Sequence, residues 1–236
     1  FYMKLVHKKM TMMSTYNENA TGIIYSLGFE ISDLNKRVSE MHKVITDTSW
    51  LTPLDIIDKL TYEARSKPTI DKVVNDILNK VEDTISDEFG EYMVSDSAQT
   101  ILNNHLNHIR APLAELIKEK ITGNPGFDFH TESPDKIVSF GEAKYSGVQN
   151  SHGRSLKQIS DFINAKKDIQ ELSDLRNFLS DTAILNAAQG KKSFCAAFSI
   201  ISDDVNSIME NALQSSYMDR LLSYEAIYLV GVKVCA

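Results

Sequence analysis

Apolar residues recur every third or fourth position between residues 32 and 121, which predicts a succession of amphipathic helices. Leu34, Val38 and Met41 lie on one face of the first. Further helices are expected over residues 54–64, 69–81, 98–106 and 112–121, the last with Pro112 in its first turn. Residues 1–30 show no clear period, apart from a possible strand and turn at 23–28.

The pattern changes after Gly123, Pro125 and Gly126, which end the helical region. Strands are expected over residues 127–130, 136–145, 192–201 and 224–234, and helices over 155–172, up to 188, and 203–215. The last two strands are apolar on both faces, as in sheets covered by helices on both sides. The chain is therefore expected to be an α/β protein, with a mainly helical N-terminal region (1–110) before an α/β domain (111–236).

The composition is that of a globular protein, with 42% hydrophobic and 24% charged residues. No apolar run approaches the roughly 20 residues that span a bilayer, and the first residues lack the pattern of a signal peptide. Cys195 and Cys235 lie in apolar strand-like runs, which favours buried free thiols over a disulfide. These features favour a cytoplasmic location.

The formal net charge of −7 is unevenly distributed along the chain. Residues 105–168 contain nine Lys/Arg and eight Asp/Glu, so the remainder carries a formal −8. An acidic chain does not coat nucleic acid by bulk charge. The least acidic window is therefore the segment expected to face a phosphate.

This window contains Asp128, Glu142 and Lys144, in the spacing D-x13-E-x-K. On a strand, alternate side chains share a face, so Glu142 and Lys144 point the same way. If the strand of Asp128 pairs with theirs, two carboxylates and an ammonium converge. The alternatives are a solvent-facing Asp128 and a surface ion pair between Glu142 and Lys144.

Two carboxylates beside an ammonium suit the hydrolysis of a phosphodiester. Asp128 and Glu142 could bind Mg²⁺, or Mn²⁺ in its place, because hard cations prefer oxygen ligands. The metal activates a water molecule and stabilises the leaving oxygen, while Lys144 orients the water or neutralises phosphate charge. Glu115, on the predicted helix before the first strand, is the best candidate for a further metal ligand, ahead of Glu119.

The pattern around Asp128, Glu142 and Lys144 resembles that of the PD-(D/E)xK nuclease superfamily. The resemblance implies a restriction-endonuclease-like core in the order α-β-β-β-α-β and Mg²⁺-dependent cleavage of DNA or RNA. Gln158 matches the glutamine of the Q-x-x-x-Y element of one branch, in which it assists the active site, although Phe162 replaces the tyrosine. The literal Pro-Asp pair at Asp135 lies in the predicted turn and is interpreted as a decoy.

A narrower resemblance covers residues 91–234. The segments 91–94, 112–116, 126–129 and 140–145 are similar, in this order, to those of the HamA family, the nuclease subunits of Hachiman anti-phage systems. This resemblance implies a DNA endonuclease that acts with a helicase subunit, HamB. The chain has no Gly-rich P-loop, so it is not expected to hydrolyse ATP itself.

Two other functions remain compatible with the sequence. A stand-alone type II restriction enzyme would need its own sequence-reading surface and a homodimer, and the chain shows no evident basic recognition helix. A catalytically inactive scaffold on a nuclease fold would not need the intact Asp128, Glu142 and Lys144.

Overall fold

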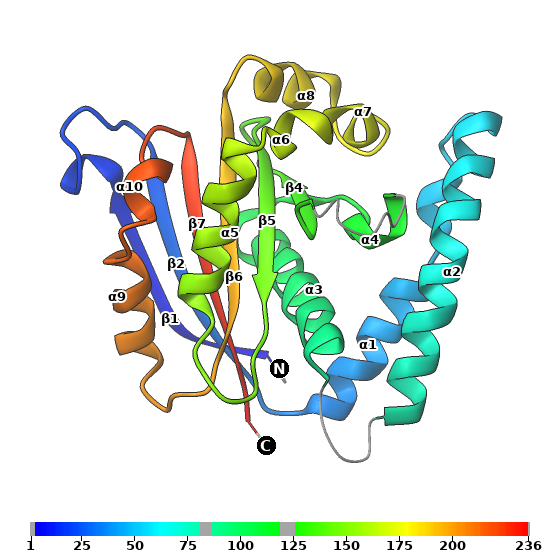
Figure 1. Ribbon diagram of the computed structural model, residues 1–236, viewed down its shortest axis with the longest axis horizontal. Coiled ribbons are helices and arrows are strands. Elements are labelled where there is room, and N and C mark those ends of the chain that lie inside the picture. Colours follow the sequence, from blue (N-terminus) through cyan, green and yellow to red (C-terminus); the bar gives the residue numbers. More distant parts are fainter. Residues whose placement is uncertain (1–2, 81–85, 119–125, 236) are drawn as a thin grey trace.

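A seven-stranded mixed sheet forms the centre of the computed structural model, which describes residues 3–80, 86–118 and 126–235 (Figure 1). The strands are β1 (Met3–Met12), β2 (Ile23–Ile31), β3 (Ile109–Arg110), β4 (Phe129–Glu132), β5 (Val138–Lys144), β6 (Lys192–Ile200) and β7 (Ala226–Val234). Their order across the sheet is β1-β2-β7-β6-β5-β4-β3. Strands β2, β7, β6 and β5 are parallel, whereas β1, β4 and β3 run antiparallel to their neighbours.

Helices cover both faces of this sheet. On one face lie α5 (His152–Asn164), α9 (Val205–Leu213) and α10 (Met218–Leu221), and on the other α1 (Leu34–Thr46) and α3 (Asp87–Leu106). The long α2 (Ile56–Lys80) packs on α1 and on the single turn α4 (Ala114–Ile117). The remaining elements are η1 (Met13–Thr15), η2 (Ser49–Leu51), α6 (Lys167–Gln170), α7 (Leu172–Leu175) and α8 (Asp181–Ala188).

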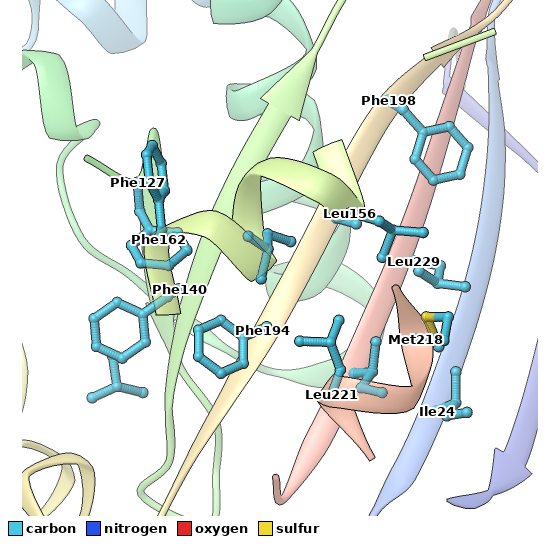
Figure 2. Packing of buried hydrophobic residues seen from close by; sticks show 14 of the residues in the cluster. Ile24, Phe127, Phe140, Leu156, Phe162, Phe194, Phe198, Met218, Leu221 and Leu229 are labelled. Carbon is cyan, nitrogen blue, oxygen red and sulfur yellow. The ribbon is translucent and has the colours of Figure 1, made fainter. Parts of the chain in front are cut away.

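Aromatic rings fill the core beneath α5 (Figure 2). Phe127 contacts Phe140 and Phe162, with ring centroids 5.3 and 5.1 Å apart, and Phe140 contacts Phe194. Strands β5 and β6 contain no exposed residue. They are buried along their whole length because helices cover both faces of the sheet. This rigid block fixes the end of β5 at which the candidate site lies.

The prediction of a helical N-terminal part is wrong for the first thirty residues. Strands β1 and β2 form an antiparallel hairpin, and β2 joins the sheet by pairing with β7. The signal in β1 is weak because it is an edge strand that buries little, with a register irregularity between Leu5 and His7. The α/β class itself is confirmed.

Two predicted helices are in fact one. Helix α2 continues through Pro68, where the sequence predicts a break between residues 64 and 69. A proline inside a helix removes one hydrogen bond to the carbonyl four residues earlier. The remainder of the 25-residue helix, supported by packing on α1 and α4, outweighs that loss.

Other boundaries differ more modestly. The helix predicted over residues 112–121 is ordered as the single turn α4, while residues 119–125 lie outside the described part. The helix predicted over 155–172 ends at Asn164 and is followed by the short α6 and α7. Among the described helices, none is both long and apolar enough to cross a membrane.

Candidate active site

Asp128 lies immediately before β4, where the ladder to β5 begins. Its backbone N–H donates to the carbonyl of Gly141 at 2.9 Å, and its side-chain Oδ2 accepts from the N–H of Ala143 at 2.8 Å. The carboxylate therefore continues the strand pairing by one residue. Because side chains opposite each other in a ladder share a face, Asp128 is placed beside Glu142, as the sequence predicts.

Glu142 and Lys144 lie at the carboxyl end of β5, between β6 and the start of β4. Glu142 is fully buried, and its Oε1 lies 2.8 Å from Lys144 Nζ. Within the described residues, neither Glu142 oxygen accepts a hydrogen bond of satisfactory geometry, so the contact with Lys144 is an ion pair without a well-directed hydrogen bond. A buried carboxylate in this state has unused capacity to bind a cation.

Glu91 was not predicted as a site residue, yet it contacts the candidate lysine directly. It lies on α3, and its Oε1 is 3.3 Å from Lys144 Nζ. Its signal in the sequence is an acid inside the most apolar run of the helix, where Tyr92, Met93 and Val94 are all buried. Glu91 and Asp128 are separated by 36 residues, and no known motif spacing predicts that the two acids lie in one site.

A small pocket opens between α3, α4 and Asp128. Its walls are Glu88, Glu91, Tyr92, Ser95, Leu113, Glu115 and Asp128. The structure therefore brings the predicted Glu115 to the same pocket as Asp128, together with two further acids from α3. Burial and the neighbouring carboxylates of Glu115 and Glu88 raise the pKa of Tyr92, so its phenol remains protonated.

The pKa values of Asp128 and Glu142 are raised, which favours the neutral forms of these two acids. Burial raises the pKa of Asp128 to about 7, against the opposing effects of Lys144 and the Ala143 N–H. Burial and the charge of Asp128 raise the pKa of Glu142 well above its ordinary value. Burial would lower the pKa of Lys144, but the carboxylates of Glu142, Asp128 and Glu91 raise it. The single ammonium group of Lys144 therefore faces three carboxylates, so negative groups outnumber positive groups in the site.

A buried clamp holds the chain on both sides of Asp128. Glu171 Oε1 accepts from the Phe127 N–H at 2.9 Å and from Lys118 Nζ at 2.6 Å, and Lys118 Nζ also donates to the Phe127 carbonyl. Glu171 Oε2 lies 2.7 Å from His130 Nε2. Phe127 and His130 are thereby fixed, and Asp128 between them has little freedom to move.

Three other residues of the sequence analysis fall outside this cluster. Gln158 lies on α5 beside the buried stripe of Leu156, Ile159 and Phe162, and the structure describes no hydrogen bond from it to the three core site residues. Asp135 lies exposed in the β4–β5 turn, at the far end of β5. Glu119 lies outside the described residues.

The donor set fits a divalent cation that is completed by water and substrate. In the described part of the chain, no three acidic, histidine or cysteine side chains form a ready-made metal centre. Mg²⁺ is commonly held by one or two carboxylates with water and substrate phosphates. The buried carboxylate of Glu142, which pairs with Lys144 but accepts no well-directed hydrogen bond, and the neighbouring Asp128 match that smaller requirement.

Comparison with protein-family models, curated proteins and solved structures finds no match to this chain.

Proposed function

We propose that this protein is a divalent-metal-dependent nuclease that hydrolyses phosphodiester bonds in DNA. The observation that carries the proposal is the buried carboxylate of Glu142, which lacks a well-formed hydrogen bond and lies against Lys144 and Asp128. Burying carboxylates together costs free energy, and a fold retains such a cluster where it is needed for chemistry.

The order of elements supports the same proposal. Along the chain, α3, β3, β4, β5, α5 and β6 occur in this order, with the short α4 between β3 and β4 and the short α6, α7 and α8 before β6. Without these short helices, the order is the α-β-β-β-α-β order of the PD-(D/E)xK nucleases. Asp128 precedes β4 and Glu142 and Lys144 end β5, as the resemblance in sequence implies. We assign the nuclease core to this part of the sheet, which β7 and the β1–β2 hairpin extend.

Each side chain has a distinct role in this proposal. Asp128 and Glu142 bind the cation, and Glu115 and Glu91 add negative charge from the pocket wall. The bound metal supplies a water of lowered pKa and stabilises charge on the leaving oxygen. Lys144 has only N–H donors to offer, so it orients the attacking water or neutralises a phosphate oxygen.

Plasmid cleavage tests the proposal. The purified chain should cut plasmid DNA in Mg²⁺ or Mn²⁺ and not in EDTA, and Asp128→Ala or Glu142→Ala should lower the rate at least about 100-fold. Asp135→Ala is the matched control, because this exposed aspartate lies at the opposite end of β5 and should leave the rate unchanged. Equal rates for wild type and Glu142→Ala would remove the assignment.

We further propose that the nuclease is the effector of an anti-phage complex with a HamB-like helicase. The support is the resemblance to HamA together with the formal −8 outside residues 105–168, which weakens capture of DNA by the isolated chain. A helicase partner would deliver the DNA and restrain cutting until ATP is turned over.

Co-expression with such a helicase tests this second step. Size-exclusion chromatography should give a stable complex whose plasmid cleavage depends on ATP. A chain that ignores the helicase, forms a homodimer and cuts one fixed sequence would instead be a restriction enzyme.

A further inference from the structure

Tyr92 has a buried hydroxyl without a well-directed hydrogen bond in the fold. The residue lies on α3 next to Glu91, and only 8% of its surface is exposed. Its Oη makes no hydrogen bond of satisfactory geometry to the described residues, although the carboxylate of Glu115 lies beside it. The same side chain lines the acidic pocket that contains Asp128.

Tyr62 shows how this chain treats a buried phenol whose role is structural. Tyr62 is 3% exposed, and its Oη donates to Asp174 at 3.2 Å and accepts from Asn177 at 3.1 Å. A buried polar group without a partner destabilises the fold, so most such groups are paired. The Tyr92 hydroxyl, which lacks such well-directed bonds, is therefore a candidate for contact with a ligand.

The chemistry of the pocket narrows the kind of ligand. Its charged walls are the carboxylates of Glu88, Glu91, Glu115 and Asp128, which only accept hydrogen bonds when ionised, whereas a phenol can donate one. A ligand that carries acceptor oxygens into such surroundings needs an accompanying cation. A phosphodiester with its divalent metal meets both requirements.

We propose that Tyr92 is a further catalytic residue, whose O–H donates a hydrogen bond to a non-bridging oxygen of the scissile phosphate. This inference rests on the proposed nuclease function. A neutral donor neutralises part of the charge that develops on that oxygen, and it does so without competing with Lys144 for the metal-bound water. The buried ring holds the hydroxyl in place.

The experiment compares Tyr92→Phe with Tyr62→Phe, each of which removes one oxygen atom and leaves the ring. For Tyr92→Phe, the melting temperature in EDTA should equal or exceed that of wild type, because no well-directed hydrogen bond is lost and the buried polar oxygen is removed. The single-turnover cleavage rate in Mg²⁺ should fall about 10- to 100-fold. Affinity for a short duplex in Ca²⁺ should weaken about three- to tenfold, while affinity for the metal alone is unchanged.

Tyr62→Phe should give the reverse result, a lower melting temperature with an unchanged cleavage rate. A Tyr92→Phe protein that melts early and cleaves normally would show that the hydroxyl serves the fold, and would overturn the inference. If the wild type cuts no DNA, the proposed function fails. In that case the duplex affinities in Ca²⁺ alone test whether Tyr92 contacts the phosphate. Equal affinities of wild type and Tyr92→Phe would overturn the role of Tyr92.

Discussion

At the scale of single residues, the site is built at the expense of stability. Glu142 is completely buried with only an ion pair to Lys144, which Glu91 also contacts. A buried charge in this position destabilises the folded chain until a cation binds. Binding of the metal should therefore stabilise the protein as well as activate it.

Replacing Glu142 by Gln should raise the stability of the metal-free protein. The folded-state pKa of Glu142 lies above its ordinary value of 4.5, so its destabilising effect is absent below that pH and grows as the pH rises above it. In EDTA at pH 7.5, Glu142→Gln should increase the free energy of unfolding by about 1–3 kcal/mol. Lys144 keeps Glu91 and Asp128 as partners, so its own charge remains compensated.

Urea denaturation of both proteins at pH 4.5 and pH 7.5 measures this effect. The gain should vanish at the lower pH, and added Mg²⁺ should stabilise wild type but not Glu142→Gln. A gain of equal size at both pH values would point to a cause other than ionisation.

At the scale of elements, the clamp around Glu171 decides where β4 begins. Burial alone would raise the pKa of Glu171, but the hydrogen bond with His130 and the charge of Lys118 lower it. Glu171 therefore stays ionised and holds the backbone of Phe127. This link connects the α6–α7 segment to the strand that carries Asp128.

A side chain at position 126 should break this clamp. A Cβ at Gly126 would lie 2.1 Å from Glu171 Oε1 and 2.7 Å from Lys118 Nζ. The Glu171 carboxylate cannot move aside without losing its partners, so Gly126→Ala should destabilise the protein by roughly 1–3 kcal/mol and lower cleavage. Thermal unfolding and plasmid cleavage measure the two effects.

Gly153→Ala is the matched control for this substitution. A Cβ there meets nothing within 4 Å, and the residue lies in the first turn of α5, where alanine favours the helix. Its stability should equal or exceed that of wild type by up to about 1 kcal/mol. The clamp would have no role if both substitutions behaved alike.

The sequence predicted those elements and site residues whose signal is local. Glu142 and Lys144 share a face because they are two residues apart on one strand, and β6 and β7 are recognisable from their apolar runs. Glu91 was missed because only tertiary packing brings α3 to the end of β5. Strand β3, of two residues, and the edge strand β1 were missed because pairing partners, not their own residues, define them.

At the scale of the whole molecule, the net negative charge of the protein disfavours binding of DNA, the proposed substrate. The chain carries a formal −7, and the pocket beside Asp128 is lined by further acids. Phosphates approach such a surface unfavourably unless cations intervene.

Binding of DNA should therefore depend on a divalent cation before any bond is cut. Fluorescence anisotropy with a labelled duplex in Ca²⁺, a hard cation that takes the same oxygen ligands, should give an affinity at least about tenfold tighter than in EDTA. Glu142→Ala should lose most of that gain. Equal affinities in Ca²⁺ and EDTA would mean that DNA binds away from the acidic site.

The pairing of β2 with β7 also has a consequence for how the chain is made. Ile23 of β2 pairs with Ala226 of β7, so the β1–β2 hairpin can join the sheet only after β7 has left the ribosome. At a synthesis rate of about 5–20 residues per second, that interval is roughly 10–40 s. Strands β3 to β6, with their helices, are complete earlier and can assemble around the future active site. During this time the apolar residues of β2 depend on chaperones or on transient contacts for protection.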